Sequence, residues 1–312
     1  MIVNGTKSHQ AYSPLNTQKL KYSPFYLISL LPFRMLYALS DFSFFMLYGV
    51  FKYRRNVVEM NLRNSFPEKS PEEIKQISKR FYKHFCDITI ESVKALSMVP
   101  AAISQRFRIT NPELLEKYYK EQRSVILYTA HYGNWEWLAF LPLSTTYTAS
   151  TFYQPLSNSY YDGLMKLIRG RFGVICIESS KGYKQLLQFK KENILTITYM
   201  VGDQRPGKKS TMYWTTFLNQ QTAFLTGAEV IARKTNQVLL YPSYKKVKRG
   251  YYELTFVLLD DQPQEHPEFS VIEKYISAIE ENICISPEMW LWSHRRWKLK
   301  VPEQSAELNQ QL

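Results

Sequence analysis

The stretch Ser124-Val-Ile-Leu-Tyr-Thr-Ala-His131-Tyr-Gly133-Asn134-Trp-Glu136-Trp137 carries the main indication of the fold. Its first part, Val125–Thr129, is a short apolar run that predicts a buried strand. A polar loop follows, in which Gly133 allows a tight turn and Asn134 can cap a helix. The stretch therefore indicates a strand, a loop and a helix, with His131 at the carboxyl end of the strand.

The same alternation continues along the chain. Further apolar runs predict strands at Ala149–Tyr153, Ile194–Tyr199, Val238–Tyr244 and Leu254–Leu259, with helical patterns near residues 134–142, 158–170, 181–191 and 222–234. We expect an α/β domain with a central mixed or mostly parallel sheet flanked by helices. Ligands of such sheets bind beyond the carboxyl ends of the strands, so His131 lies where chemistry is expected.

An upstream helix is predicted by its own start signal. Ser70 is a suitable N-cap, Pro71 suits the first helical position, and acidic residues fill the first turn. Apolar residues then recur at helical spacing from Ile74 to Ile88, which predicts one face packed on a core.

His131 is a candidate general base. A carboxylate at Glu136, in the first turn of the next helix, can accept from one imidazole nitrogen while the other nitrogen faces a substrate. Backbone N–H groups at the start of that helix can stabilise a developing oxyanion. A structural histidine is the alternative, and the position at a strand end favours catalysis. The sequence has no Gly-x-Ser-x-Gly, HExxH or Cys–His signature, so we predict neither a metal nor another cofactor.

The composition limits the class of protein. The 312 residues are 45% hydrophobic and 15% aromatic, which excludes a disordered or low-complexity chain. A net charge of +13 with many Tyr and Trp side chains suits either nucleic acid or an anionic membrane surface. The three cysteines, Cys86, Cys176 and Cys284, form no CxxC pair and predict no disulfide framework.

The N-terminal part suggests a membrane anchor. Residues 1–22 form a polar tail, and residues 23–55 contain a hydrophobic stretch with a basic flank. The stretch is long enough to cross a bilayer, but Pro32, Arg34 and Asp41 interrupt it. We expect a spanning or interfacial anchor rather than a cleaved signal peptide, with a buried soluble helix as the alternative. Residues 56–302 form one predicted domain, followed by a polar tail at 303–312.

Five blocks of the sequence, taken in order, carry a family resemblance. They are Arg54–Glu68, His131-x4-Glu136, Val201–Arg205, Thr226–Pro242 and Pro287–Trp297. These blocks resemble those of the bacterial lipid A late acyltransferases, which have a His-x4-Asp/Glu motif, and the resemblance covers roughly residues 20–300. It implies a glycerolipid-acyltransferase-like fold in a membrane-associated O-acyltransferase without a cofactor.

The resemblance also implies roles for particular residues. His131 becomes the general base, with Glu136 as its orienting partner, and Asp203 matches a functional aspartate. A functional arginine falls on Arg169 or Arg171. We place Arg171, which precedes the Phe-Gly turn, in the catalytic group, and Arg169 with Asn134 and Gln204 in substrate binding.

The same resemblance implies the substrates and the location. The acyl donor would be acyl-acyl carrier protein and the acceptor a lipid A precursor or a related aminolipid or glycolipid. The enzyme would act at the bacterial inner membrane, with its catalytic domain on the cytoplasmic side. A +13 chain suits an acidic carrier and a phosphorylated glycolipid.

Nucleic-acid binding is the alternative from a different class. Lys245–Tyr252 and Arg295–Lys298 interleave basic and aromatic residues, a pattern that can bind phosphates and stack bases. The first run falls where a hairpin turn is expected, so we interpret it as a solvated turn and predict no nucleic-acid partner. A third alternative, an inactive membrane scaffold, is disfavoured because His131 and Glu136 are both present.

Overall fold

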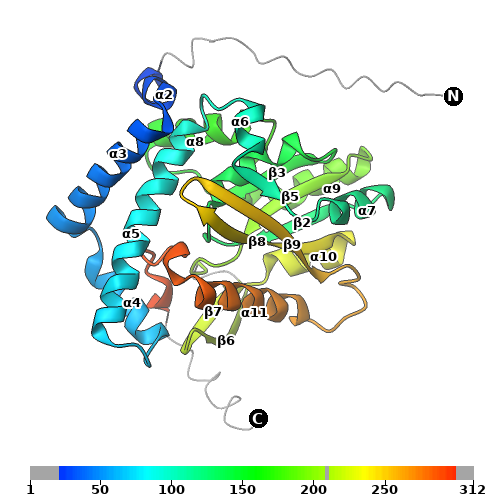
Figure 1. Ribbon diagram of the computed structural model, residues 1–312. Coiled ribbons are helices and arrows are strands. Elements are labelled where there is room, and N and C mark those ends of the chain that lie inside the picture. The colour runs from blue at the N-terminus through cyan, green and yellow to red at the C-terminus, as the bar shows by residue number, and fades with distance from the viewer. Residues whose placement is uncertain (1–20, 208–210, 300–312) are drawn as a thin grey trace, which may run out of the picture.

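A seven-stranded sheet forms the centre of the molecule (Figure 1). The structure is a computed structural model that describes residues 21–207 and 211–299. The strand order is β1-β9-β8-β2-β5-β3-β4. The strands are β1 Phe107–Ile109, β2 Val125–Thr129, β3 Thr148–Tyr153, β4 Ile175–Glu178, β5 Thr196–Val201, β8 Val238–Lys248 and β9 Tyr251–Asp260. Only the β8–β9 pair is antiparallel, so the sheet is mixed and mostly parallel, as predicted.

Helices pack around the sheet, and a group of them lies at one side of it (Figure 1). The α-helices are α2 Ser23–Leu30, α3 Phe33–Phe44, α4 Arg55–Ser65, α5 Pro71–Lys94, α6 Pro100–Ser104, α7 Glu113–Lys120, α8 Ser159–Gly170, α9 Gly182–Lys191, α10 Gly227–Thr235 and α11 Ser270–Ile285. Shorter turns are the π-helix η1 Phe45–Val50 and the 3₁₀ helices η2 Trp135–Leu143, η3 Ser179–Lys181, η4 Pro287–Met289 and η5 Arg296–Lys298. A hairpin of β6 Met212–Phe217 and β7 Gln220–Leu225 forms a second sheet.

The five predicted strands are present, and the structure adds four that the sequence pattern did not indicate, namely β1, β4, β6 and β7. The largest correction falls in residues 222–234, where the expected helix begins only at Gly227 because β7 occupies the first part. The segment predicted as a helix after His131 is the 3₁₀ helix η2, which contains Pro142. Proline lacks the N–H that a longer α-helix would need there.

Helix α5 shows why a good start signal fixes a helix. The Ser70 hydroxyl accepts from the Glu73 N–H at 3.3 Å, and the Glu73 carboxylate accepts from the Ser70 N–H at 2.8 Å. This capping box satisfies two donors at the helix start, and Ser70 is the N-cap that the sequence predicted. The apolar face that includes Ile74, Ile77 and Phe81 is buried in the main core.

Helices α2 and α3 lie along α5, on its side away from most of the sheet (Figure 1). In the described part of the chain, no single helix is long and apolar enough to cross a bilayer. The pair Ser23–Leu30 and Phe33–Val50 passes the same test together, but it is bent by 118°. Most of the predicted tail at 1–22, and all of the tail at 303–312, lie outside the described residues.

Candidate active site

The carboxyl ends of β2 and β5 bring two predicted site residues together. These strands pair in parallel, with Thr129 opposite Val201. His131 and Asp203 each follow two residues later, so the register places them side by side. The Asp203 carboxylate accepts from His131 Nδ1 at 2.9 Å and from the His131 backbone N–H at 2.9 Å. One carboxylate therefore fixes both the ring and the main chain of His131.

Asp203 is itself held by the C-terminal segment. The Trp290 indole N–H donates to Asp203 Oδ2 at 2.8 Å, and the Asp203 side chain is 2% exposed. Burial alone would raise the pKa of Asp203, but the neighbouring imidazole and the three donors outweigh it and lower that pKa. Asp203 is therefore ionised at neutral pH and keeps the proton of His131 on Nδ1. No pattern in the sequence pointed to Trp290 as the third donor.

Glu136 occupies a different position from the one expected. Its carboxylate accepts from Arg169 Nε at 2.9 Å and from Arg169 Nη2 at 2.7 Å. Burial raises the pKa of Glu136, but the Arg169 guanidinium, His131 and the Trp135 indole together lower it, so the net shift is downward. The expectation that Glu136 orients the imidazole is corrected, since Asp203 holds that place. Glu136 is also close enough to His131 for a charge interaction, and this interaction contributes to the lowered pKa of Glu136.

The two candidate arginines point to different surroundings. Arg169, on α8, lines the same cavity as His131 and pairs with Glu136. Arg171 donates to the backbone carbonyl of Ala95 and is not among the residues that line the cavity. The geometry therefore brings Arg169 to the site and leaves Arg171 outside it.

Gln204 and Asn134 also separate. Gln204 Nε2 lies 3.2 Å from His131 Nε2, so the free ring nitrogen accepts a hydrogen bond from an amide at the mouth of the site. Asn134 is completely buried and donates to Glu91 at 2.7 Å. Its side chain makes no cap bond to η2, and it does not line the cavity, so the capping expectation was wrong.

A cavity of about 900 Å³ opens in front of His131. Its wall includes the polar side chains of His131 and Gln204, which follow the strand ends, and of Glu136 on η2 and Arg169 on α8. Apolar side chains form much of the rest: Leu138, Ala139, Val174, Met200, Leu225, Ala228 and Ile231. A pocket of this size, lined by both apolar side chains and convergent polar groups, is typical of a binding site for a small organic or lipid ligand.

Two of the sequence blocks, Arg54–Glu68 and Pro287–Trp297, bond to each other next to this site. Asn61 on α4 donates to the backbone carbonyls of Trp292 and His294, at 2.9 and 3.0 Å. Arg54 donates to the Ser293 carbonyl at 3.1 Å. These bonds hold the segment whose Trp290 reaches Asp203. Segments that are far apart in the sequence therefore converge behind one histidine.

His294 has a structural role in this bracing. Its Nε2 accepts from the Arg205 backbone N–H at 3.2 Å, next to Gln204 in sequence. Burial lowers the pKa of His294 to about 4, so the ring is neutral and able to accept at neutral pH. The basic-aromatic cluster that contains His294 is thus partly directed into the protein, and Arg296 nearby is 2% exposed.

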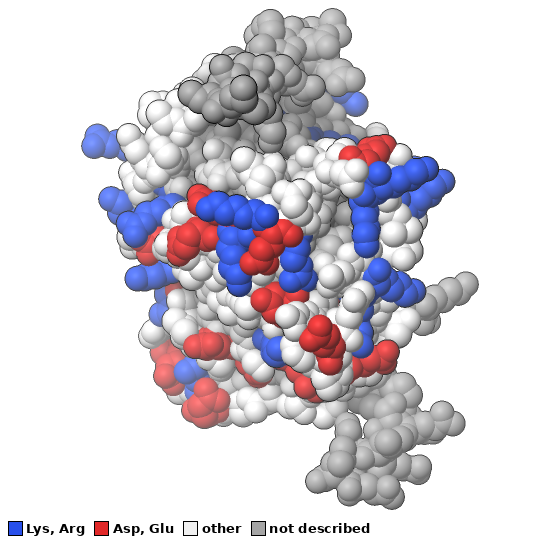
Figure 2. Space-filling model, turned by 90° about the vertical axis from the view of Figure 1, so that its right-hand side faces the viewer, with Lys and Arg blue, Asp and Glu red and all other residues white. Residues whose placement is uncertain are grey.

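The basic run at 245–252 is a hairpin turn, as expected, but two of its charges are paired internally. Lys246 lies 3.6 Å from the Asp87 carboxylate, and Arg249 pairs with Asp87 at 2.6 Å and with Asp41 at 2.7 Å. On the face shown in Figure 2, acidic and basic side chains are interspersed. These pairings weaken the argument for a continuous phosphate-binding surface, which rests on free cations.

A histidine that is held by a buried carboxylate and lines a cavity at the ends of parallel strands is typical of an enzyme active site. Within residues 21–207 and 211–299, no group of three or more His, Cys, Asp or Glu side chains is arranged to hold a metal ion. The family model for bacterial lipid A biosynthesis acyltransferases matches residues 20–299. The chain belongs to this family and is an acyltransferase of lipid A biosynthesis.

Curated relatives agree over most of their length. The chain is 22% identical to the lipid A biosynthesis lauroyltransferase of Escherichia coli K12 over 277 residues, which covers 88% of this chain and 89% of that protein. It is 20% identical over 257 residues to the lipid A biosynthesis palmitoleoyltransferase of the same organism and to a lipid A biosynthesis acyltransferase of Shigella flexneri. Each of these two matches covers 82% of both chains. The proposed resemblance of the sequence blocks is thereby confirmed.

Proposed function

We propose that the protein transfers a fatty acyl chain from an acyl thioester to a hydroxyl group of a lipid A precursor, with His131 as the general base. The observation that carries the proposal is the Asp203–His131 pair at the strand ends, with His131 in the wall of the cavity. Asp203 keeps a proton on Nδ1, so Nε2 presents a lone pair on the side where Gln204 now donates. An acceptor hydroxyl that displaces Gln204 would donate to that nitrogen.

The reaction needs one proton carrier. As Nε2 takes the proton from the acceptor O–H, the oxygen forms a C–O bond to the thioester carbon and the carbonyl becomes an oxyanion. Collapse of this intermediate breaks the C–S bond, and the leaving thiolate takes the proton back from Nε2. The buried Asp203 carboxylate stabilises the imidazolium formed between these two steps.

Two side chains near Nε2 are assigned supporting roles. The Gln204 amide lies 3.2 Å from Nε2 and can donate a hydrogen bond to the thioester carbonyl oxygen as negative charge develops on it. Arg169 keeps a cation at the cavity wall for substrate phosphate or oxyanion charge, while Glu136 fixes its orientation through two bonds. We therefore assign to Arg169 the role first given to Arg171.

The donor and the acceptor follow from charge and shape. The chain carries a formal charge of +13, which favours an acidic acyl carrier protein as donor and a phosphorylated glycolipid as acceptor. The apolar wall formed by residues such as Leu138, Val174 and Ile231 suits the hydrocarbon chain. The curated relatives are named as lauroyl and palmitoleoyl transferases, which supports a fatty acyl group without specifying its length here.

The helix pair α2–α3 would hold the enzyme on the membrane surface. The pair, together with η1 and Phe51 after it, exposes large apolar side chains: Leu27, Leu30, Met35, Phe42, Phe45, Val50 and Phe51. Its inner face is tied to α5, where Lys94 donates to the Ser29 and Leu31 carbonyls. Since the pair is bent by 118° and bonded along α5, we propose that it lies in one leaflet, on the cytoplasmic side of the bacterial inner membrane.

Acyl transfer with matched variants tests the proposal. Purified protein in detergent is given radiolabelled acyl-acyl carrier protein and a lipid A precursor, and the product is identified by mass spectrometry. His131→Ala is expected to lower kcat by at least ~10²-fold. The control is His266→Ala, because His266 is half exposed and pairs with Asp260 outside the cavity.

Each outcome has a distinct meaning. Wild-type transfer with loss only in His131→Ala supports the base and the substrates together. Transfer that survives His131→Ala contradicts the mechanism. A folded wild type that transfers nothing to the lipid A precursor contradicts the acceptor, and a screen of bacterial aminolipids and glycolipids then replaces it.

A further inference from the structure

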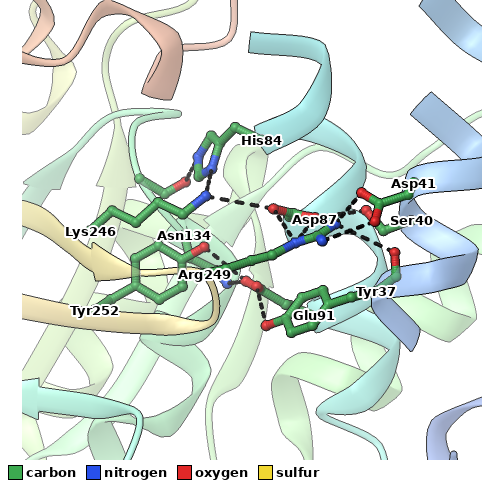
Figure 3. Close-up of polar contacts among 11 residues, drawn as sticks. Tyr37, Ser40, Asp41, His84, Asp87, Glu91, Asn134, Lys246, Arg249 and Tyr252 are labelled. Carbon is green, nitrogen blue, oxygen red and sulfur yellow. Dashed lines mark hydrogen bonds and ion pairs between the residues drawn. The ribbon is translucent and has the colours of Figure 1, made fainter. Parts of the chain in front are cut away.

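A buried polar cluster contacts the loop that follows His131, at Gly133 and Asn134 (Figure 3). It is built on α5, where His84, Asp87 and Glu91 follow one another at helical spacing and are each at most 3% exposed. Charged groups at this depth are costly unless they are bonded. The cluster is unused by the proposed mechanism, so its position beside the loop needs an explanation.

Glu91 is the member whose side chain bonds to a side chain of the loop (Figure 3). Its Oε2 accepts from Asn134 Nδ2 at 2.7 Å and from the Tyr252 hydroxyl at 2.9 Å, and its Oε1 accepts from the Tyr37 hydroxyl at 2.9 Å. The Glu91 backbone carbonyl also accepts from the Trp137 indole N–H at 3.4 Å. One residue of α5 therefore holds positions on both sides of Glu136.

Asn134 depends on this contact. Its side chain is fully buried, and among the described residues its Oδ1 has no hydrogen-bond partner. The bond to Glu91 is thus what orients the Asn134 amide. An unpaired buried oxygen lowers the stability of the folded state, so packing alone does not explain an asparagine at position 134.

The neighbouring residue is held by the same helix. His84 Nε2 lies 3.2 Å from the Gly133 carbonyl oxygen, and Lys246 Nζ lies 3.3 Å from His84 Nδ1. Burial lowers the pKa of His84 to about 3, so the ring is neutral, receives from Lys246 and donates to Gly133. Two consecutive loop residues, Gly133 and Asn134, are therefore fixed by α5 between His131 and Glu136.

We propose that Glu91 is a positioning residue, which sets the His131–Glu136 loop through Asn134 so that the imidazole meets Asp203 and Glu136 meets Arg169. This inference rests on the proposed role of His131 as the base. A shift of the loop by a fraction of an ångström would change the alignment of both pairs at once. A misalignment of that size lowers the rate at which bound substrate reacts, rather than the affinity of the enzyme for the substrate.

A reciprocal exchange of the two side chains provides the test. Asn134→Asp places a carboxylate against the Glu91 carboxylate, so the loop is pushed away. Adding Glu91→Gln restores a donor–acceptor pair in the reverse sense, because the amide introduced on α5 then donates to the carboxylate introduced in the loop. The hydroxyls of Tyr37 and Tyr252 can each donate or accept, so both remain satisfied in the exchanged pair.

Activity is measured at pH 8, where two carboxylates least readily share a proton. Asn134→Asp is expected to lower kcat by about 10²-fold with KM changed less than about threefold, and the double variant is expected to recover at least ~10-fold. Tyr37→Phe is the matched control, since it removes a donor to Glu91 without a contact to the loop, and it should keep kcat within about threefold. Melting temperatures are recorded for all variants.

A second readout needs no substrate. The ¹⁵N resonances of the His131 ring report its tautomer, so they test positioning even if the proposed acyl transfer fails. Asn134→Asp is expected to shift the ring away from its Nδ1–H form, and Glu91→Gln in the double variant to return it. Loss of stability without a change in kcat or tautomer, or a loss that Glu91→Gln does not recover, overturns the proposal.

Discussion

Asp203→Asn separates the two carboxylates that compete for the role of orienting partner. In the native site, Asp203 Oδ1 faces His131 Nδ1, while Oδ2 faces two donors, the His131 backbone N–H and the Trp290 indole. An asparagine amide keeps both of these donors satisfied only if its oxygen takes the Oδ2 place. Its NH₂ group then points at Nδ1 and drives the ring proton to Nε2.

The consequence is a base that cannot accept. With the proton on Nε2, the nitrogen that faces the acceptor hydroxyl has no lone pair for it. The same exchange in a histidine–aspartate pair of serine proteases lowers kcat by about 10⁴-fold, and we expect roughly 10³–10⁴-fold here. This corresponds to about 4–5.5 kcal/mol of transition-state stabilisation. Since two of the three hydrogen bonds persist, the folded state loses only about 1–2 kcal/mol.

The assay compares Asp203→Asn with Glu136→Gln. Steady-state acyl transfer gives kcat and KM, and ¹⁵N spectra of labelled histidine give the His131 tautomer. Asp203→Asn should lower kcat with little change in KM and move the proton to Nε2, whereas Glu136→Gln should leave the Nδ1–H tautomer in place because Glu136 bonds to Arg169. The reasoning is refuted if Glu136→Gln changes the tautomer and Asp203→Asn does not.

Three further perturbations follow from individual contacts. Arg169→Ala leaves the Glu136 carboxylate buried without its partner and should cost about 3 kcal/mol in urea unfolding, while Arg169→Lys keeps the charge and should cost less. His84→Gln should remove a pH dependence: the native pKa is about 3 and the unfolded value is 6.5, so the wild type loses stability as pH falls below 6.5, by about 2 kcal/mol between pH 6.5 and 5, and the variant loses less over that interval. Gly133→Ala should destabilise by about 2–4 kcal/mol in thermal unfolding, because its φ is +67° and a Cβ there would lie 2.5 Å from Tyr244 Cβ.

The fold was largely predictable because the central strands are continuous apolar runs. Val125–Thr129 is buried at every position. Such a run indicates a strand that is covered on both faces, even though apolar and polar residues do not alternate. The strands that the pattern missed carry weaker signals. β1 has only three residues, and β6 from Met212 to Phe217 is mostly half-buried, so neither presents a fully apolar run.

The members of the site were more predictable than their partners. His131, Glu136, Arg169 and Gln204 line one cavity, and Asp203 bonds to His131, whereas Arg171 and Asn134 lie outside the lining. Local spacing, however, assigned Glu136 to His131, because only neighbours along the chain can be compared without a topology. The pairing with Arg169 depends on how α8 packs against η2, and no local pattern encodes that packing.

The Asp203–His131 pair shows which single fact was missing. His131 follows its predicted strand by two positions, whereas Asp203 follows the strand predicted at Ile194–Tyr199 by four, because β5 extends to Val201. The sequence does not state that β2 and β5 are adjacent, since β3 and β4 intervene along the chain. Once β2 and β5 are paired in parallel, Thr129 opposite Val201 forces His131 opposite Asp203. A change that slipped this register by one residue would turn the two side chains to opposite faces. The pairing of these two side chains is therefore a property of strand order, and substitutions that weaken the β2–β5 pairing should abolish activity without touching either residue.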